Sequence, residues 1–227
     1  MPSAMAMQYL ILGDIHERFQ KVSLIPELNS AAGFLISGDL TNIGEVYKAK
    51  QILEALRAIK PFVLAQFGNM DRPEINTWLS EENCNLHRTV WELTPDTAIF
   101  GIGGAIFTPF GTPSEFPESN FLFWLDELWN KVQQYAHTIL VAHNPPYDTL
   151  CDRIAQGTHV GSKAVKEFIE EHQPDLCICG HIHESRACDR IGRTQIVNPG
   201  AFAHGNYAVL TIAADGMLSV ALRRLQE

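Results

Sequence analysis

Basic residues are scarce in this 227-residue chain, which has 17 Lys and Arg against 26 Asp and Glu and a formal net charge of -9. Such an acidic surface repels phosphate backbones and anionic lipids, so we expect no non-specific binding to nucleic acid or to membranes. If the substrate is itself an anion, a local group must reverse this field. Long hydrophobic runs are lacking too, because the longest, AIFGIGGAIF, is broken by glycines and too short to span a bilayer.

Cysteine is also sparse. The five cysteines include no Cys-x-x-Cys pair, and they are too few for a disulfide scaffold in a chain of this length. We expect Cys177 and Cys179, which share one face of a strand-like run, to be small buried hydrophobic residues. The N-terminus MPSAMAMQYL lacks the basic segment and apolar core of a secretory signal, so we expect a cytoplasmic protein.

Apolar residues, by contrast, make up 46% of the chain, which is enough for a continuous core. No internal repeat, low-complexity run or charged linker divides the sequence. The sequence therefore predicts a flexible N-terminus at residues 1–6 and a single domain over residues 7–227.

Five short apolar runs each close on a small residue or glycine and then on a polar side chain that could bind a metal. They are YLILGD ending at Asp14, FLISGD at Asp39, FVLAQFGN at Asn69, TILVAH at His143 and LCICGH at His181. Continuous apolar runs indicate strands that are buried on both faces. Because ligands bind beyond the carboxyl ends of such strands, the five polar side chains can converge on one place.

Helical periodicity fills three of the intervening segments, over residues 46–59, 121–132 and 164–169, and Pro61 and Pro174 follow the first and last of them. Strands that alternate with helices predict an α/β domain with parallel pairing at its start. After residue 193 the strand patterns TQIV, YAVLTI and MLSVAL follow closely, with a hairpin signal at Asp215-Gly216. We therefore expect two packed sheets flanked by helices.

The polar residues form a chemically coherent donor set. At an extended strand end, a spacing of two residues aims both side chains the same way, as for Asp14 with His16 and His181 with His183. Carboxylate, carboxamide and imidazole donors without a thiolate suit Mn²⁺, Fe or Zn²⁺. The seven donors are too many for one tetrahedral ion. With one shared carboxylate they would bind two ions about 3.5–4 Å apart. The full set is Asp14, His16, Asp39, Asn69, His143, His181 and His183.

Each of these residues also has an ordinary explanation. An Asp after a strand is often a helix N-cap or turn residue, and Asn69 after Gly68 is a typical turn former. His143 could close a loop, and a His-x-His pair could lie on the surface. These explanations lose weight together, because each would have to hold independently at five successive strand ends.

At five motifs in order, the chain resembles the calcineurin-like metallophosphoesterase superfamily: GDIH (13–16), GDL (38–40), GNMD (68–71), AHNPP (142–146) and GHIH (180–183). The resemblance covers residues 7 to about 204, and NPPYDT and VNPGA are similar to the small single-domain bacterial and archaeal phosphoesterases. It implies a four-layer α/β/β/α sandwich of two mixed β-sheets flanked by helices.

The resemblance also implies a role for every member of the donor set. One ion would be held by Asp14, His16 and His183, a second by Asn69, His143 and His181, and both by the bridging Asp39. The implied ions are two divalent metals, with Mn first and Fe, Zn or Ni as alternatives. Two carboxylates offset only part of their charge, which leaves a cationic spot for phosphate. The implied reaction is attack of a metal-bridging hydroxide on the phosphorus of a small-molecule phosphate ester.

Position 70 departs from the pattern of many phosphomonoesterases in the superfamily, which have a leaving-group-protonating histidine where this chain has Met70. The small bacterial and archaeal relatives often lack this histidine too and mostly hydrolyse phosphodiesters, so the resemblance implies a phosphodiesterase. Met70 would then either pack in the core or wall the leaving group. Alternatives are a phosphomonoesterase or protein phosphatase, or a non-catalytic scaffold such as the related retromer subunit. Among the candidate catalytic residues, His159 could replace the missing acid and His204 is a weaker candidate; both could instead be solvated.

Several residues around the motifs have more than one possible role. Asp71 could orient a ligand histidine or pair with Arg72, and His87 has the look of an edge or surface residue. The loop at 108–119 is rich in Pro, Gly and Ser and has two Phe, and the loop at 144–162 carries Tyr147, Arg153 and His159. They could shape specificity over the site or form a homodimer contact.

Overall fold

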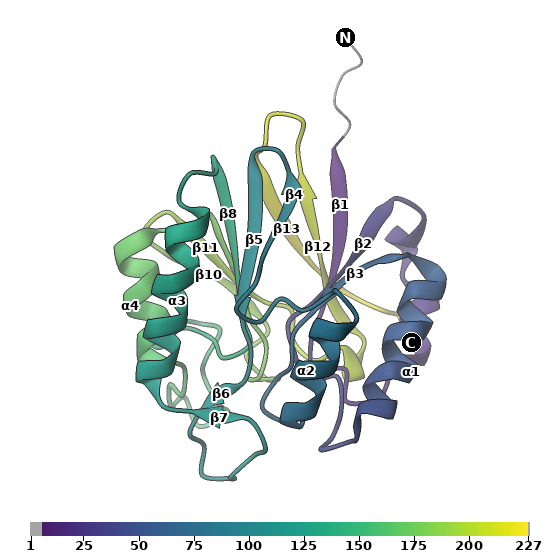
Figure 1. The fold of residues 1–227 in the computed structure, drawn as a ribbon, viewed down its shortest axis with the longest axis horizontal. Helices are drawn as coiled ribbons and strands as arrows, with labels where there is room; N and C mark the ends of the chain where they lie inside the picture. The colour runs from purple at the N-terminus through teal and green to yellow at the C-terminus, as the bar shows by residue number, and fades with distance from the viewer. Residues whose placement is uncertain (1–5, 227) are drawn as a thin grey trace.

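The computed structural model describes residues 6–226, so the flexible segment expected for residues 1–6 lies, apart from residue 6, outside the described part. Two large mixed sheets face each other (Figure 1). The first has the strand order β13-β12-β1-β2-β3, in which β1, β2 and β3 are parallel and β12 and β13 antiparallel. Its strands are β1 (Met7–Leu12), β2 (Ala31–Ile36), β3 (Phe62–Ala65), β12 (Asn206–Ile212) and β13 (Leu218–Arg224).

The second sheet has the order β10-β11-β9-β8-β5-β4, with four parallel central strands and an antiparallel strand at each edge. A separate parallel pair, β6 with β7, follows the second sheet's strand β5. The strands are β4 (Val90–Thr94), β5 (Thr97–Ile102), β6 (Ala105–Ile106), β7 (Glu115–Phe116), β8 (His137–Ala142), β9 (Leu176–Ile178), β10 (Ala187–Ile191) and β11 (Thr194–Asn198).

Helices cover the outer face of each sheet, α1 and α2 on the first and α3 and α4 on the second (Figure 1). This arrangement confirms the predicted four-layer α/β/β/α sandwich of two mixed sheets. The helices are α1 (Val46–Ile59), α2 (Pro73–Glu81), α3 (Glu118–Val132) and α4 (Lys163–His172), with short 3-10 turns η1 (Gln20–Leu24), η2 (Pro26–Asn29) and η3 (Phe202–His204).

Successive side chains of a strand point to opposite faces of the sheet, and here each face packs against another layer of the fold. In β1, Tyr9 and Ile11 pack into the core between the two sheets, whereas Leu10 and Leu12 pack under the helices of the first sheet. Burying a side chain of this kind contributes about 1.5–3 kcal/mol. The continuous apolar runs in the sequence are therefore the signature of a layered fold in which neither strand face meets water.

The predicted helices begin and end close to where the sequence placed them. Helix α1 spans residues 46–59, and Lys60 is already extended before the proline. Helix α4 is capped by Ser162, whose hydroxyl accepts a hydrogen bond from the backbone N–H of Val165. Helix α2 and strands β4, β5 and β10 were not predicted. The start of α2 at Pro73, with Ile75 and Leu79 buried one turn apart, is a signal that could have identified it.

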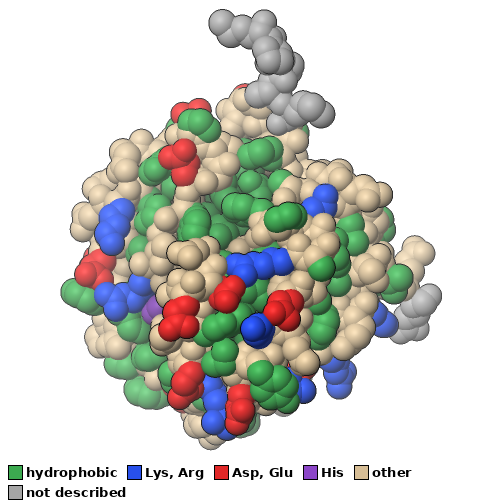
Figure 2. All heavy atoms as spheres, turned by 45° about the vertical axis from the view of Figure 1, so that its right-hand side comes forward, with side chains coloured by type: hydrophobic (Ala, Val, Ile, Leu, Met, Phe, Trp, Pro, Cys, Tyr) green, Lys and Arg blue, Asp and Glu red, His purple; other side chains and the backbone are tan. Residues whose placement is uncertain are grey.

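Charges of both signs are interspersed on the face shown in Figure 2, with hydrophobic side chains exposed between them. The acidic balance of the chain is therefore not gathered into one patch on this face. Within residues 6–226, none of the helices has the length and apolar character needed to cross a bilayer.

Candidate metal centre

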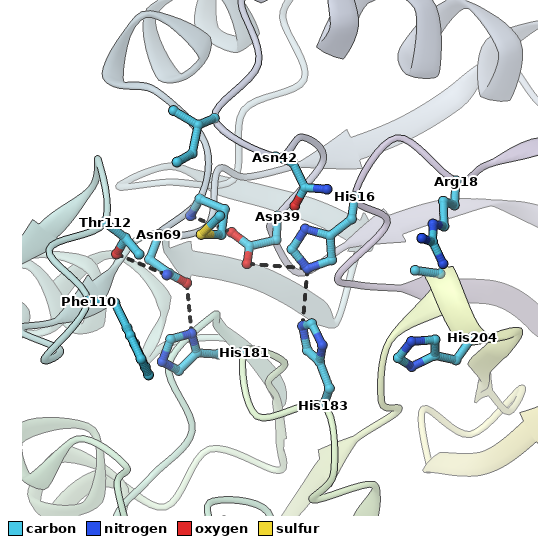
Figure 3. A pocket seen from close by; sticks show the side chains of 13 residues that line it. His16, Arg18, Asp39, Asn42, Asn69, Phe110, Thr112, His181, His183 and His204 are labelled. Atoms are coloured by element: carbon cyan, nitrogen blue, oxygen red, sulfur yellow. Dashed lines mark hydrogen bonds and ion pairs between the residues drawn. The ribbon is translucent and has the colours of Figure 1, made fainter.

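The seven residues of the predicted donor set lie together, in loops that follow the strands of both sheets. Figure 3 shows five of them, namely His16, Asp39, Asn69, His181 and His183. The donor set forms two clusters whose ligand atoms lie within 4.8 Å of one another. Asn69 joins the second of these, because its Oδ1 lies 2.7 Å from His181 Nδ1. The first cluster contains Asp14, His16, Asp39 and His183, and the second contains Asp39, His143 and His181. Asp39 is thus shared between the clusters.

Four of these residues have a left-handed backbone that is uncommon for a residue with a side chain, namely Asp14 (φ 51°), His16 (φ 47°), Asp39 (φ 52°) and His181 (φ 66°). Each such residue costs about 1–3 kcal/mol unless its surroundings hold it in place. Tertiary hydrogen bonds do so here. The backbone N–H of Asp14 donates to Gly38 O over 3.0 Å, and that of His181 donates to Asp14 Oδ1 over 3.0 Å.

The glycines before the ligands serve mainly to allow close approach. A Cβ at Gly68 would collide with the carboxylate of Asp39, and one at Gly180 would lie 2.8 Å from Asp14 Oδ2. Of the glycines that directly precede a ligand, Gly38 has a positive φ, of 130°, while Gly13, Gly68 and Gly180 do not. The left-handed turns therefore fall largely on the candidate ligands and not on the glycines before them.

The first cluster brings together two buried carboxylates and two imidazoles. Asp14 Oδ1 lies 3.2 Å from His183 Nε2, and His16 Nε2 lies 3.1 Å from His183 Nε2 and 3.8 Å from Asp39 Oδ2. Burial alone would raise the pKa of Asp14, but its hydrogen bond with His183 and the neighbouring imidazole charges lower it to about 2. The same hydrogen bond raises the pKa of His183. Donor atoms thus converge where a cation would relieve their mutual repulsion.

The second cluster is built around His143, which is completely buried. Its Nδ1 donates to the carbonyl oxygen of Ser37 over 3.1 Å, which orients the ring so that Nε2 faces the site. Nε2 lies 3.5 Å from Asp39 Oδ2 and 3.1 Å from Asn69 Oδ1. Burial would lower the pKa of His143, but the carboxylate of Asp39 raises it to about 9. Burial lowers the pKa of His181 to about 4.

The carboxamide of Asn69 is oriented by residues that the sequence analysis did not single out. Its Nδ2 donates to Thr112 Oγ1 over 3.0 Å, and that hydroxyl donates to Glu115 Oε1 over 2.6 Å. With its nitrogen engaged in this way, Asn69 directs Oδ1 toward His143 and His181. The sequence had identified the surrounding loop, residues 108–119, but not the orienting hydroxyl.

Asp71 takes neither of the two roles considered for it. Its carboxylate accepts hydrogen bonds of 2.8–3.0 Å from the backbone N–H groups of Leu40, Thr41 and Gly68, and from the Thr41 hydroxyl. Burial, with the nearby carboxylate of Asp39, raises the pKa of Asp71 to about 7. Asp71 therefore ties the loop after β2 to the loop after β3, and so fixes the relative position of two ligands.

An open hollow of about 600 Å³ lies over the clusters. Met70 lines it and is half-buried, and its backbone N–H donates to Asp39 Oδ1 over 2.8 Å. Met70 therefore belongs to the wall of the site and not to the packed core. Arg18 and His204 lie on one side of the ligands and Phe110 on the other (Figure 3).

The candidate proton donors occupy different positions. His204 lines the hollow, with its ring centroid 6.2 Å from that of His183. His159 instead lines an adjoining cavity, where its Nδ1 lies 2.6 Å from Asp152 Oδ1. His87 was expected at an edge or the surface, and this was wrong. It is buried, with its ring centroid 4.8 Å from that of Phe67.

The donor set fits a pair of divalent cations. The two nearest imidazole nitrogens, on His16 and His183, are 3.1 Å apart, and the carboxamide oxygen of Asn69 faces two more imidazoles. Without a cation, the repulsion between these lone pairs could be relieved only by protons shared between the donor atoms. Two carboxylates and a mixture of nitrogen and oxygen donors match the preferences of Mn²⁺, Fe or Zn²⁺.

Comparisons with known proteins agree with this geometry. The profile of the family described as "Metallophosphoesterase, calcineurin superfamily" matches residues 52–217. An uncharacterised protein of Methanocaldococcus jannaschii is 34% identical over 200 residues, which cover 85% of this chain and 88% of that protein.

Solved structures share the fold. The protein TT1561 of Thermus thermophilus has a TM-score of 0.71 at 18% identity and covers 98% of this chain and 100% of its own. A dimetal phosphatase from Danio rerio has a TM-score of 0.64 at 10% identity and covers 97% of each chain. At these identities the structures support the fold alone, whereas the family profile covers most of the sequence. The chain belongs to the calcineurin superfamily of metallophosphoesterases.

Proposed function

We propose that this protein is a binuclear-metal-dependent phosphoesterase that hydrolyses phosphodiesters, with Mn²⁺ as its preferred ion. The observation that carries the proposal is the pair of ligand clusters joined by the single carboxylate of Asp39. One ion would be held by Asp14, His16 and His183, the other by Asn69, His143 and His181, and Asp39 would contact both.

When bound, two divalent ions lower the pKa of a shared water and stabilise the charge that develops on phosphoryl oxygens. The protein's residues supply the positioning. Ser37 and Thr112 fix the orientations of His143 and Asn69, and Asp71 fixes the two loops that carry Asp39 and Asn69. Rigid placement of this kind is what aligns a substrate with its attacking group.

The preference for diesters rests on Met70. This side chain lines the hollow and cannot donate a proton, and general acid catalysis is commonly worth about 10²–10⁴-fold. Without a general acid at this position, hydrolysis is favoured for esters with good leaving groups. Phosphomonoester hydrolysis is the second candidate, and it is favoured by the position of His204 in the same hollow, where an imidazole could supply the proton.

The test is Mn²⁺-dependent hydrolysis of bis-4-nitrophenyl phosphate, compared with 4-nitrophenyl phosphate, by the wild type and by Asp39→Asn. We expect activity to require the metal, to be higher with the diester and to be lost in the variant. Asp126→Asn is the matched control, because this exposed carboxylate lies on α3 outside both clusters. Circular dichroism would establish that Asp39→Asn is folded. A folded wild type that binds two ions and hydrolyses neither ester would contradict the proposal.

A further inference from the structure

A second cavity, of about 700 Å³, lies beside the metal-site hollow and shares Phe110, His181 and His183 with it. Its walls come from the segments at 106–110, 147–163 and 181–184, with Glu118. The volume is within the range of about 300–1,000 Å³ that small-molecule sites occupy. A phosphate ester with its phosphorus at the clusters could therefore extend its organic part into this cavity without leaving the protein surface.

Three Phe and Tyr side chains line this cavity. Phe107 and Phe110 are 68% and 84% exposed, and Tyr147 lies in the facing segment. Figure 3 places the ring of Phe110 next to His181, at the edge of the ligand clusters. Two large rings left in water contribute little to folding, and neighbouring exposed rings beside a polar site are typical of a ligand-binding surface.

Two of the titratable groups that line the cavity, Glu118 and His159, are already engaged by the protein. The Glu118 carboxylate accepts hydrogen bonds from Ser162 Oγ and from the backbone N–H groups of Lys163 and Ala164. His159 is paired with Asp152. A ligand in this cavity would therefore meet rings and the aliphatic side chains of Ile154, Val160 and Ile182, with Gln156 and Lys163 as polar neighbours.

The loop that carries the exposed rings is tied to one of the proposed metal ligands. The loop between β6 and β7 carries both of them, and Glu115 closes it by accepting hydrogen bonds from the hydroxyls of Thr108 and Thr112. Thr112 in turn contacts Asn69. The stacking surface and the phosphate site are therefore parts of one hydrogen-bonded unit.

We propose that this cavity binds the organic group of the substrate and that this group is a planar aromatic ring or ring system, stacked on Phe110 and flanked by Phe107. The inference rests on the proposed function, because it assumes that the phosphorus of the ester lies at the clusters. Stacking on an aromatic side chain requires a flat π-face on the ligand, which aliphatic esters lack.

The experiment compares two phosphonates, which have no ester bond to hydrolyse. Calorimetry would measure the dissociation constants of phenylphosphonate and methylphosphonate with the Mn²⁺-loaded protein. We expect the wild type to bind phenylphosphonate about tenfold or more tightly than methylphosphonate. Phe110→Ala and Phe107→Ala should reduce this ratio to below about threefold. Both side chains are exposed, so the variants should fold.

The matched control is Phe123→Ala, since Phe123 is 58% exposed on α3 and lines neither cavity. It should keep the wild-type ratio. Equal binding of both probes by the wild type, no binding of phenylphosphonate, or an unchanged ratio in Phe110→Ala would each overturn the inference. The readout is separate from catalysis: a phenyl preference without ester hydrolysis would refute the proposed function and leave the aromatic cavity standing.

Discussion

The carboxamide nitrogen of Asn69 donates a hydrogen bond of 3.0 Å to the hydroxyl of Thr112. This contact decides which end of the carboxamide faces the second cluster. Thr112→Val keeps the side-chain volume and removes the hydroxyl, so we expect affinity for one of two Mn²⁺ ions to fall about 10–100-fold while the other is unaffected.

A calorimetric Mn²⁺ titration would resolve the two binding events in Thr112→Val. Thr108→Val is the matched control, because its hydroxyl also donates to Glu115 without contacting Asn69. An equal loss of affinity in both variants would show that the loop, and not the orientation of Asn69, sets metal binding.

The metal-free protein should release protons when it takes up metal. The carboxylate of Asp39 raises the pKa of His143 to about 9 against the effect of burial, so this imidazole is protonated at pH 7. A ligand imidazole must be neutral, so Mn²⁺ uptake displaces its proton, and affinity should rise with pH up to about 9.

Calorimetry in buffers of different ionisation enthalpy measures this release directly. The binding enthalpy at pH 7 should vary with the buffer, corresponding to at least one released proton per protein. A binding enthalpy that is the same in every buffer would contradict the prediction.

His87 should make the protein acid-sensitive. Burial, with a smaller effect of the charge on Arg88, lowers the pKa of His87 from 6.5 to about 3. Below pH 6.5, His87 therefore binds a proton in the unfolded chain but stays neutral in the folded chain until the pH approaches 3. The stability that His87 contributes is fully present above pH 6.5 and is lost as the pH falls toward 3.

His87→Asn tests this contribution, because its carboxamide oxygen can accept from the backbone N–H of Gly103, as His87 Nδ1 does over 2.9 Å. Between pH 7 and pH 4.5, the wild type should lose about 2–3 kcal/mol more unfolding free energy than the variant. Urea denaturation at the two pH values measures the difference. Parallel losses in the two proteins would mean that His87 is not the responsible group.

The two candidate leaving-group acids can be separated by substrate. His204 lines the hollow, whereas His159 is held by Asp152 in the adjoining cavity. An acid is needed most where the leaving group is poor. We therefore expect His204→Gln to slow a phenyl ester about tenfold or more while changing a 4-nitrophenyl ester little, and His159→Gln to affect both alike.

Steady-state kinetics with both esters would check this prediction. Selective slowing of the phenyl ester in His159→Gln would assign the acid to His159 instead. Equal slowing of both esters in His204→Gln would remove His204 as the acid.

The sequence was most informative where burial and chemistry coincide. Apolar runs that end in donor residues predicted the strands and the convergence of all seven side chains, because strands buried on both faces leave a clear pattern. Helix α2 was missed although Pro73 marks its first turn. The short strand β10, from Ala187 to Ile191, alternates half-buried and exposed residues and has no continuous apolar run to identify it.

Features that depend on tertiary contacts between distant parts of the chain could not be predicted. The role of Asp71 depends on backbone N–H groups about 30 residues away along the chain, and that of Thr112 on a contact with Asn69 across two loops. The left-handed backbone at His16 and His181 is imposed by these surroundings and not by glycine. The burial of His87 likewise follows from tertiary packing against Phe67, for which the sequence carries no local signal.

The position of β1 in its sheet has a consequence for synthesis. Strand β1 lies between β2 and β12, so the partner on one of its sides is synthesised long after β1 itself. At about 5–20 residues per second, the nascent chain spends many seconds with that edge of β1 unpaired. Each ligand cluster also draws on both sheets, and each needs a histidine from the motif at residues 180–183. Until that motif has left the ribosome neither cluster is complete, so the proposed uptake of metal would be a late event in the making of this protein.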